Sequence, residues 1–155
     1  MKIKFLSLFL LAFCLQSCNE KKVFDELDKD FPENRWLKGV TKNFEFSIEQ
    51  EARNYDVNVH FAYFSDFVIN PVPLFVTIIY PDGTEEKTTL NLVVKDSEGK
   101  ETGECGGDYC DIREIIFKNE ALKKGVYKIA IQQQFDGAYL PNVNGIGIEV
   151  VAQAD

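Results

Sequence analysis

The sequence predicts an all-β fold, a single antiparallel β-sandwich of about seven or eight strands. Apolar and polar residues alternate along several segments, which is typical of strands with one buried face. Turn-forming sequences such as Asp82-Gly83 separate these segments. Because no long helical segment lies between the expected strands, neighbouring strands are expected to pair antiparallel. A closed barrel is the alternative that the same pattern allows.

The first 17 residues have the composition of a cleaved export signal. Lys2 and Lys4 give a positively charged start, and residues 5–15 are apolar except for Ser7. An apolar run of this length fits a secretory signal and is too short to span a bilayer, which takes about 20 residues. No later segment approaches that length, so no transmembrane helix is expected in the mature protein.

The signal ends in Leu15-Gln16-Ser17-Cys18, which resembles a bacterial lipobox. The resemblance implies that Cys18 becomes the first mature residue and carries a diacylglycerol thioether and an acylated amine. More than one acyl chain makes such attachment stable, because a single chain binds a membrane only marginally. The alternative is an ordinary secreted protein with an incidental cysteine near its cleavage site.

The mature protein is strongly acidic. Without the two lysines of the signal, 15 basic side chains face 25 acidic ones, a formal charge of −10. Such a protein is a poor partner for nucleic acid and is not attracted to anionic lipid. We therefore expect no nucleic-acid partner, and membrane attachment through the lipid on Cys18 alone.

The mature chain divides at residue 44. Residues 18–43 are predicted to be the lipidated N-terminus followed by an irregular tether that docks through Trp36, and Pro32 argues against one continuous helix there. Residues 44–155 are predicted to form the sandwich. A single helical turn is expected at residues 120–124. The expected strands are 44–48, 55–63, 74–80, 86–95, 112–118, 126–135 and 146–151.

Cys105 and Cys110 are the only cysteines beyond the signal and Cys18. Because the bacterial envelope permits disulfides, this pair can close a small loop. A zinc site would need four ligands, and His60 is the only histidine. A disulfide is therefore favoured over a metal site, with two free thiols as the alternative. No metal and no cofactor is predicted.

Candidate functional residues lie in loops. The Gly103–Asp111 segment carries Glu104, Asp108 and Asp111, which could offer oxygens to Ca²⁺, but their spacing matches no defined calcium loop. His60 falls on the polar side of its strand without an accompanying nucleophile motif, so no catalytic residue and no enzyme is predicted. The residues proposed to contact a partner are Phe64, Phe67, Asp108, Tyr109, Phe135 and Tyr139.

The order of landmarks resembles the GldH-type gliding-motility lipoproteins of the Bacteroidetes. The landmarks are Val23-Phe24, Trp36, Phe44-Glu45-Phe46, Tyr55, Leu92, Asp96-Ser97-Glu98-Gly99, the glycine-rich loop at 103–108, Gly125-Val126-Tyr127, Ile131-Gln132-Gln133 and residues 140–149. Where that family tends to carry an arginine, this chain reads His60-Phe61-Ala62-Tyr63, and Cys105 and Cys110 look particular to this chain.

This resemblance implies a non-enzymatic accessory component of the gliding machinery and its linked secretion apparatus, in contact with other envelope proteins. A lipid-anchored carbohydrate- or peptide-binding module is the alternative. Residues 19–22 lack the dense acidic run that resembles a surface-export tag in these bacteria. The expected location is therefore the outer membrane, facing the periplasm.

Overall fold

The computed structural model describes residues 21–51 and 53–153, so the expected signal and Cys18 lie outside the described residues. The described chain is built from strands and one short 3-10 helix. Those strands are β1 (Lys21–Asp28), β2 (Trp36–Leu37), β3 (Thr41–Ile48), β4 (Asn54–Phe64), β5 (Val72–Ile79), β6 (Glu85–Leu92), β7 (Glu104–Gly106), β8 (Tyr109–Ala121), β9 (Gly125–Gln133), β10 (Tyr139–Leu140) and β11 (Val143–Ala152), and the helix is η2 (Pro32–Asn34). The all-β prediction is confirmed.

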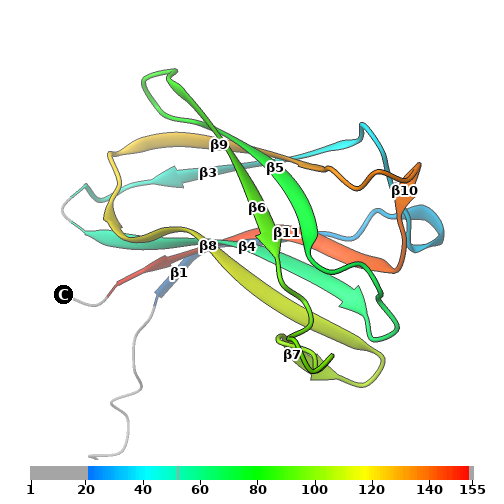
Figure 1. Cartoon of the computed structure of the whole chain (residues 1–155). Helices are drawn as coiled ribbons and strands as arrows, with labels where there is room; N and C mark the ends of the chain where they lie inside the picture. Colours follow the sequence, from blue (N-terminus) through cyan, green and yellow to red (C-terminus); the bar gives the residue numbers. More distant parts are fainter. Residues whose placement is uncertain (1–20, 52, 154–155) are drawn as a thin grey trace, which may run out of the picture.

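The strands form two facing layers (Figure 1). One layer is a five-stranded sheet in the order β1-β11-β4-β8-β7, and the other is a four-stranded sheet in the order β3-β9-β5-β6. The short strands β2 and β10 pair separately. Every strand pairing is antiparallel. The predicted antiparallel sandwich is therefore the observed architecture.

The core forms where the inward faces of the two sheets meet. Along β4, every second residue from Tyr55 to Tyr63 is buried, as the alternation predicts. The opposite layer contributes Leu74, Val76 and Ile78 from β5. Aromatic rings add to this packing: Phe46 of β3 stacks on Tyr127 of β9 with ring centroids 5.3 Å apart. Burial of these apolar surfaces is the main favourable contribution to folding.

The strand β1 was not expected, and the prediction of an irregular segment is wrong for Lys21–Asp28. These residues pair with β11 along the edge of the larger sheet. The pairing satisfies backbone groups that would otherwise leave β11 as an open edge. It requires small residues in β11, because a Cβ atom on Gly147 would collide with the carbonyl of Glu26. The side chain of Phe24 then packs on Phe46, with ring centroids 5.7 Å apart.

Two expectations about β8 also differ from the structure. The predicted helical turn at residues 120–124 is wrong, because β8 continues to Ala121 and pairs with the start of β4. Leu122, just beyond the strand, is buried against the core. At its other end β8 begins at Tyr109, earlier than expected. The glycine-rich segment, expected as a loop, therefore contains β7 and the start of β8, which pair as a hairpin. Tertiary pairing with β4 therefore outweighs the local helical preference.

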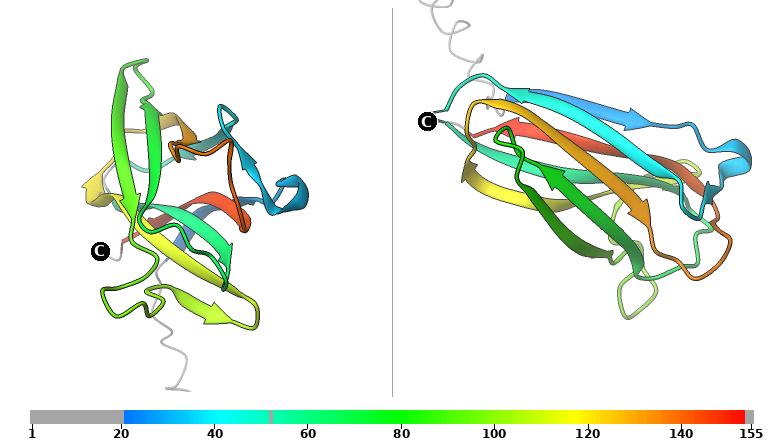
Figure 2. Two further views of the ribbon diagram at one scale, coloured as in Figure 1. Left: turned by 45° about the vertical axis from the view of Figure 1, so that its right-hand side comes forward. Right: turned by 90° about the horizontal axis from the view of Figure 1, so that it is seen from above.

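The strands run between two ends of the sandwich, which Figure 2 shows from above. We call one the terminal end: β1 begins there and β11 ends there, paired as Lys21 with Ala152. We call the other the hairpin end. It holds the loop 65–71, the β7–β8 hairpin and the β9–β10 connection. The Ser65 N–H of the loop donates a 2.9 Å hydrogen bond to the Asp108 carbonyl of the hairpin.

Candidate interaction site

Five of the six residues predicted to contact a partner lie with accessible side chains at the hairpin end. Phe64 and Tyr109 are paired residues of β4 and β8, and Asp108 lies next to them in the turn of the hairpin. Phe135 lies in the β9–β10 connection and Tyr139 begins β10, where the guanidinium carbon of Arg35 lies 4.7 Å from the Tyr139 ring centroid. Asp108 and Tyr109 are exposed, whereas Phe64, Phe135 and Tyr139 are half-buried.

Phe67 is the exception, and its predicted role as a surface contact is wrong. Its side chain is fully buried. A turn closed by the hydrogen bond from Phe67 N–H to the Phe64 carbonyl, 2.9 Å long, turns the chain back towards the core. The ring then packs 5.7 Å from Phe61 and 5.3 Å from Tyr63, measured between centroids. The buried ring of Phe67 therefore holds the loop 65–71 against the core.

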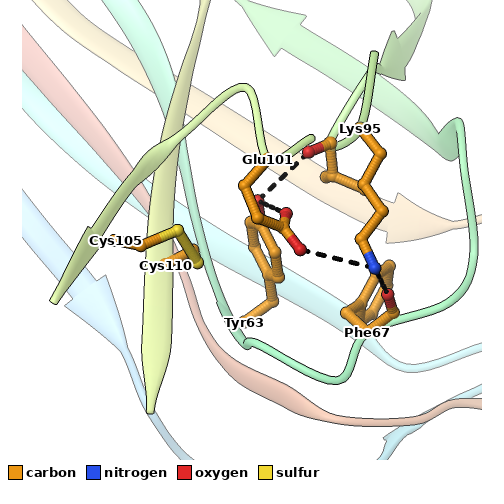
Figure 3. Close-up of a disulfide and its surroundings, with 7 residues drawn as sticks. Tyr63, Phe67, Lys95, Glu101, Cys105 and Cys110 are labelled. Carbon is orange, nitrogen blue, oxygen red and sulfur yellow. Dashed lines mark hydrogen bonds and ion pairs between the residues drawn. A yellow bond between two sulfur atoms is a disulfide. The ribbon is translucent and has the colours of Figure 1, made fainter. Parts of the chain in front are cut away.

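Ionic and polar contacts brace the same end (Figure 3). Lys95 Nζ lies 3.3 Å from Glu101 and donates a 2.7 Å hydrogen bond to the Phe67 carbonyl. The Tyr63 hydroxyl donates to Glu101 at 2.8 Å. Burial and this hydrogen bond raise the pKa of the Tyr63 phenol, so it remains a donor at neutral pH. The loops at the hairpin end are thus fastened to the core strand β4.

Cys105 and Cys110 are directly opposed in the β7–β8 hairpin and are joined by a disulfide, with sulfur atoms 2.02 Å apart. Cys105 is exposed and Cys110 is buried. The carboxylates considered for Ca²⁺ do not form a site: among the described residues, no three His, Cys, Asp or Glu side chains are grouped to hold a metal ion. Asp111 instead pairs with His60.

Replacing both Cys105 and Cys110 with serine is expected to lower the free energy of unfolding by about 2 kcal/mol, because the bond closes only a short loop. The double variant should keep its fold, since the hairpin lies at the edge of the sheet. Urea unfolding with and without a reductant measures the effect. Reductant should destabilise the unaltered protein and leave the double variant unchanged, and an equal response from both would contradict the prediction.

A second polar cluster lies on the outer face of the five-stranded sheet. Glu149 of β11 has a side chain only 7% exposed. Its carboxylate lies 2.8 Å from Lys22 Nζ of β1 and 3.3 Å from Arg113 Nε of β8. Asn58 of β4 donates to it at 3.4 Å. We call these four residues the Glu149 cluster, and it connects four adjacent strands.

His60 and Asp111 form a pair close to this cluster on the same face. His60 Nε2 and Asp111 Oδ1 are 2.5 Å apart, and the imidazole is only 9% exposed. Its Nδ1 atom is buried without a hydrogen-bond partner among the described residues. The sequence predicted that His60 lies on the polar side of its strand, but it did not predict that the imidazole is buried. Glu149 was also missed, although a lone carboxylate within the apolar run 146–151 was a detectable signal.

The Glu149 cluster predicts a pH-dependent stability. Burial alone would raise the pKa of Glu149, but the contacts with Lys22, Arg113 and Asn58 lower it overall. Because the pKa is lower in the folded state, the stabilisation is present above the ordinary value of 4.5 and is lost as pH falls through the folded value.

Glu149→Gln is therefore expected to lower the free energy of unfolding by about 1–3 kcal/mol at neutral pH. The difference from the unaltered protein should shrink as pH falls below 4.5 and through the lowered pKa of folded Glu149, where that carboxylate becomes neutral as well. Urea unfolding over a pH series measures it. The control is Glu45→Gln, whose ion pair with Lys128 is exposed and should contribute little. A constant difference at all pH values would contradict the prediction.

Within the part of the chain that the structure describes, no helix is long and apolar enough to cross a membrane.

The Glu149 cluster on the outer sheet face fastens the edge strand β1 to its neighbours. The hairpin end offers side chains on a braced frame.

Two of the similar solved structures are distant likenesses. A viral particle of infectious bursal disease virus is 15% identical, with a TM-score of 0.39, over 86% of this chain and 32% of that one. A family GH115 4-O-methyl-alpha-glucuronidase is 11% identical, with a TM-score of 0.40, over 88% of this chain and 18% of that one. This chain thus spans about a third or less of either protein, and we draw no argument from them.

The sequence comparisons are more informative. The gliding motility lipoprotein GldH of Flavobacterium johnsoniae is 27% identical over 142 residues, which cover 90% of this chain and 86% of that protein. The family model described as GldH lipoprotein matches residues 22–150, from β1 to β11. The chain belongs to the GldH lipoprotein family, whose members are lipid-anchored envelope proteins associated with gliding motility.

Proposed function

We propose that this protein is a non-enzymatic assembly component of the gliding machinery and its linked secretion apparatus. It is anchored through lipid on Cys18 to the periplasmic face of the outer membrane, and its hairpin end binds another envelope protein. Family membership supports the link to gliding. The observation that carries the binding role is a set of exposed apolar side chains on the braced loops of that end.

Val68 is the most exposed of these residues, at 78%, and it follows the buried Phe67 in the loop 65–71. Tyr109 of β8, Val93 after β6 and Leu37 of β2 are also about half exposed. Apolar patches on an ordered frame are typical of protein contact surfaces, and we propose that these side chains contribute to such a patch at the hairpin end. Because the loops are already fastened by Lys95 and Glu101, little conformational entropy is lost on binding.

The test is affinity capture of the tagged protein from detergent-solubilised envelopes of its own bacterium. The unaltered protein should recover components of the gliding or secretion machinery, and Val68→Asp should lose them. The matched control is Ile115→Asp, an exposed residue in the middle of β8 between the two ends, which should recover them normally. Recovery of no such component, or equal recovery by all three proteins, would contradict the proposal.

A genetic test is independent of detergent. Deleting the gene should abolish colony spreading and reduce extracellular protein, and the unaltered gene should restore both. The Ile115→Asp gene should restore them as well, whereas Val68→Asp should not. A deletion strain that spreads and secretes normally would contradict the proposed function.

A further inference from the structure

The distance between the anchor and the folded domain is short. The strand β1 begins at Lys21, three residues after Cys18. At about 3.3–3.6 Å per residue, the intervening chain covers at most roughly 10 Å. If Cys18 carries lipid, as proposed above, the start of β1 must therefore lie near the headgroups of the bilayer.

The strand β1 is also firmly built into the sheet, so it offers no additional length. It pairs with β11 from Lys21 to Asp28. Lys22 contacts the buried carboxylate of Glu149, and Phe24 packs on Phe46 of the opposite sheet. The membrane anchor is consequently attached to the rigid sandwich itself.

The terminal end is the part of the sandwich that this anchor brings to the membrane. Its segments are joined into one surface: Arg53 Nε donates to the Gln153 carbonyl at 2.8 Å, and Lys124 N–H donates to Glu51 at 3.3 Å. Figure 2 shows the start of β1 and the end of β11 together there, with the hairpin end on the opposite side. The strand β4 has 11 residues, which span roughly 35 Å between the two ends.

The charges along β1 favour this end over the long edge of the sheet. The cation of Lys22 beside the anchor is already paired with Asp25 and Glu149, and the carboxylates of Glu26 and Asp28 follow towards the hairpin end. A carboxylate-rich edge is repelled by anionic lipid, so lying on that edge is unfavourable. At the terminal end, by contrast, the charges are mixed, so anionic lipid repels this end less. The cations of Arg53, Lys123 and Lys124 lie there among the carboxylates of Glu49, Glu51, Asp82 and Glu120.

We propose that the sandwich stands end-on against the membrane surface, with its terminal end on the lipid headgroups and its hairpin end directed away. The occupant of the terminal end is the bilayer that holds the anchor. The exposed Val68 and Tyr109 are then presented about 35 Å from the lipid. This orientation rests on the proposed lipidation of Cys18.

Fluorescence quenching tests the orientation. The lipidated protein is reconstituted in vesicles of phosphatidylethanolamine and phosphatidylglycerol that contain a lipid with a nitroxide on its headgroup. A fluorophore is attached to Lys123→Cys at the terminal end or to Val68→Cys at the hairpin end, without reductant so that the disulfide stays closed. We expect loss of most fluorescence at position 123 and no detectable loss at position 68. Unaltered protein should take up no label.

A spacer variant is the matched control. About 20 Gly and Ser residues between Glu20 and Lys21 extend the tether to roughly 25 Å on average. Quenching at position 123 should then fall towards that at position 68, while flotation with vesicles stays the same. Equal quenching at both positions, or stronger quenching at position 68, would overturn the orientation alone. Protein that does not float with vesicles would overturn the anchor, and the orientation with it.

Discussion

Replacing Cys18 with alanine is expected to abolish incorporation of lipid into the protein. Only the thiol of cysteine can form the diacylglycerol thioether, and the acidic mature chain has no other sequence feature that favours anionic lipid. Each buried methylene contributes about 0.8 kcal/mol, so losing the acyl chains removes nearly all the membrane affinity. Labelling with a clickable fatty acid, together with the intact mass of the mature protein, measures the loss.

Cys14 provides the matched control, since it lies inside the expected signal and leaves with it. Cys14→Ala should incorporate lipid normally. The Cys18→Ala chain exported with an ordinary secretory signal in place of residues 1–17 should appear in the soluble fraction. Lipid incorporation by Cys18→Ala, or its loss in Cys14→Ala, would show that the anchor is elsewhere.

Trp36→Ala is expected to lower the free energy of unfolding by about 3–5 kcal/mol, the usual cost of removing a fully buried large aromatic side chain. The side chain is 1% exposed and packs edge-on against Phe31 with centroids 5.6 Å apart. Its indole N–H donates to the Val40 carbonyl at 2.9 Å. The segment between β1 and β3 depends on these contacts, because β2 itself has only two residues.

Urea unfolding of three variants separates the contributions. Trp36→Phe keeps most of the apolar surface and loses the hydrogen bond, so it should cost about 1 kcal/mol plus the smaller loss of packing. Leu37→Ala changes the exposed neighbour and should alter stability by less than about 0.5 kcal/mol. Equal destabilisation by Trp36→Ala and Leu37→Ala would show that Trp36 does not anchor this segment.

The sandwich core was predictable because strand alternation is a local property. Alternate apolar residues share one face in two segments, Tyr55 to Tyr63 and Phe44 to Ile48. Burying that face determines which side chains of each strand point into the core. Turn chemistry at Asp82-Gly83 defines the β5–β6 hairpin in the same local way. Most of the residues expected at a contact surface were also found near one another, because loops that follow strand ends gather at one end of a sandwich.

Phe67 was misassigned because burial in a loop depends on how the chain folds back. In sequence, Phe67 and the exposed Val68 are equivalent apolar residues after a strand, and only the turn onto Phe61 and Tyr63 distinguishes them. The Glu149 cluster has the same origin. Its four residues come from four strands, and their pairing follows from the order of the sheet.

The sequence by itself predicts an export signal and a lipid site at Cys18, and it was sufficient to identify the strands of the core and the family. These depend on short motifs and on residues that are neighbours in the chain. The tertiary structure decided that Lys21–Asp28 is an edge strand, because its pairing needs the close approach that the glycines of β11 allow and because Lys22 meets the carboxylate of Glu149. That single strand brings the folded domain to within a few residues of its proposed anchor, so long-range pairing determines how the domain can meet the membrane.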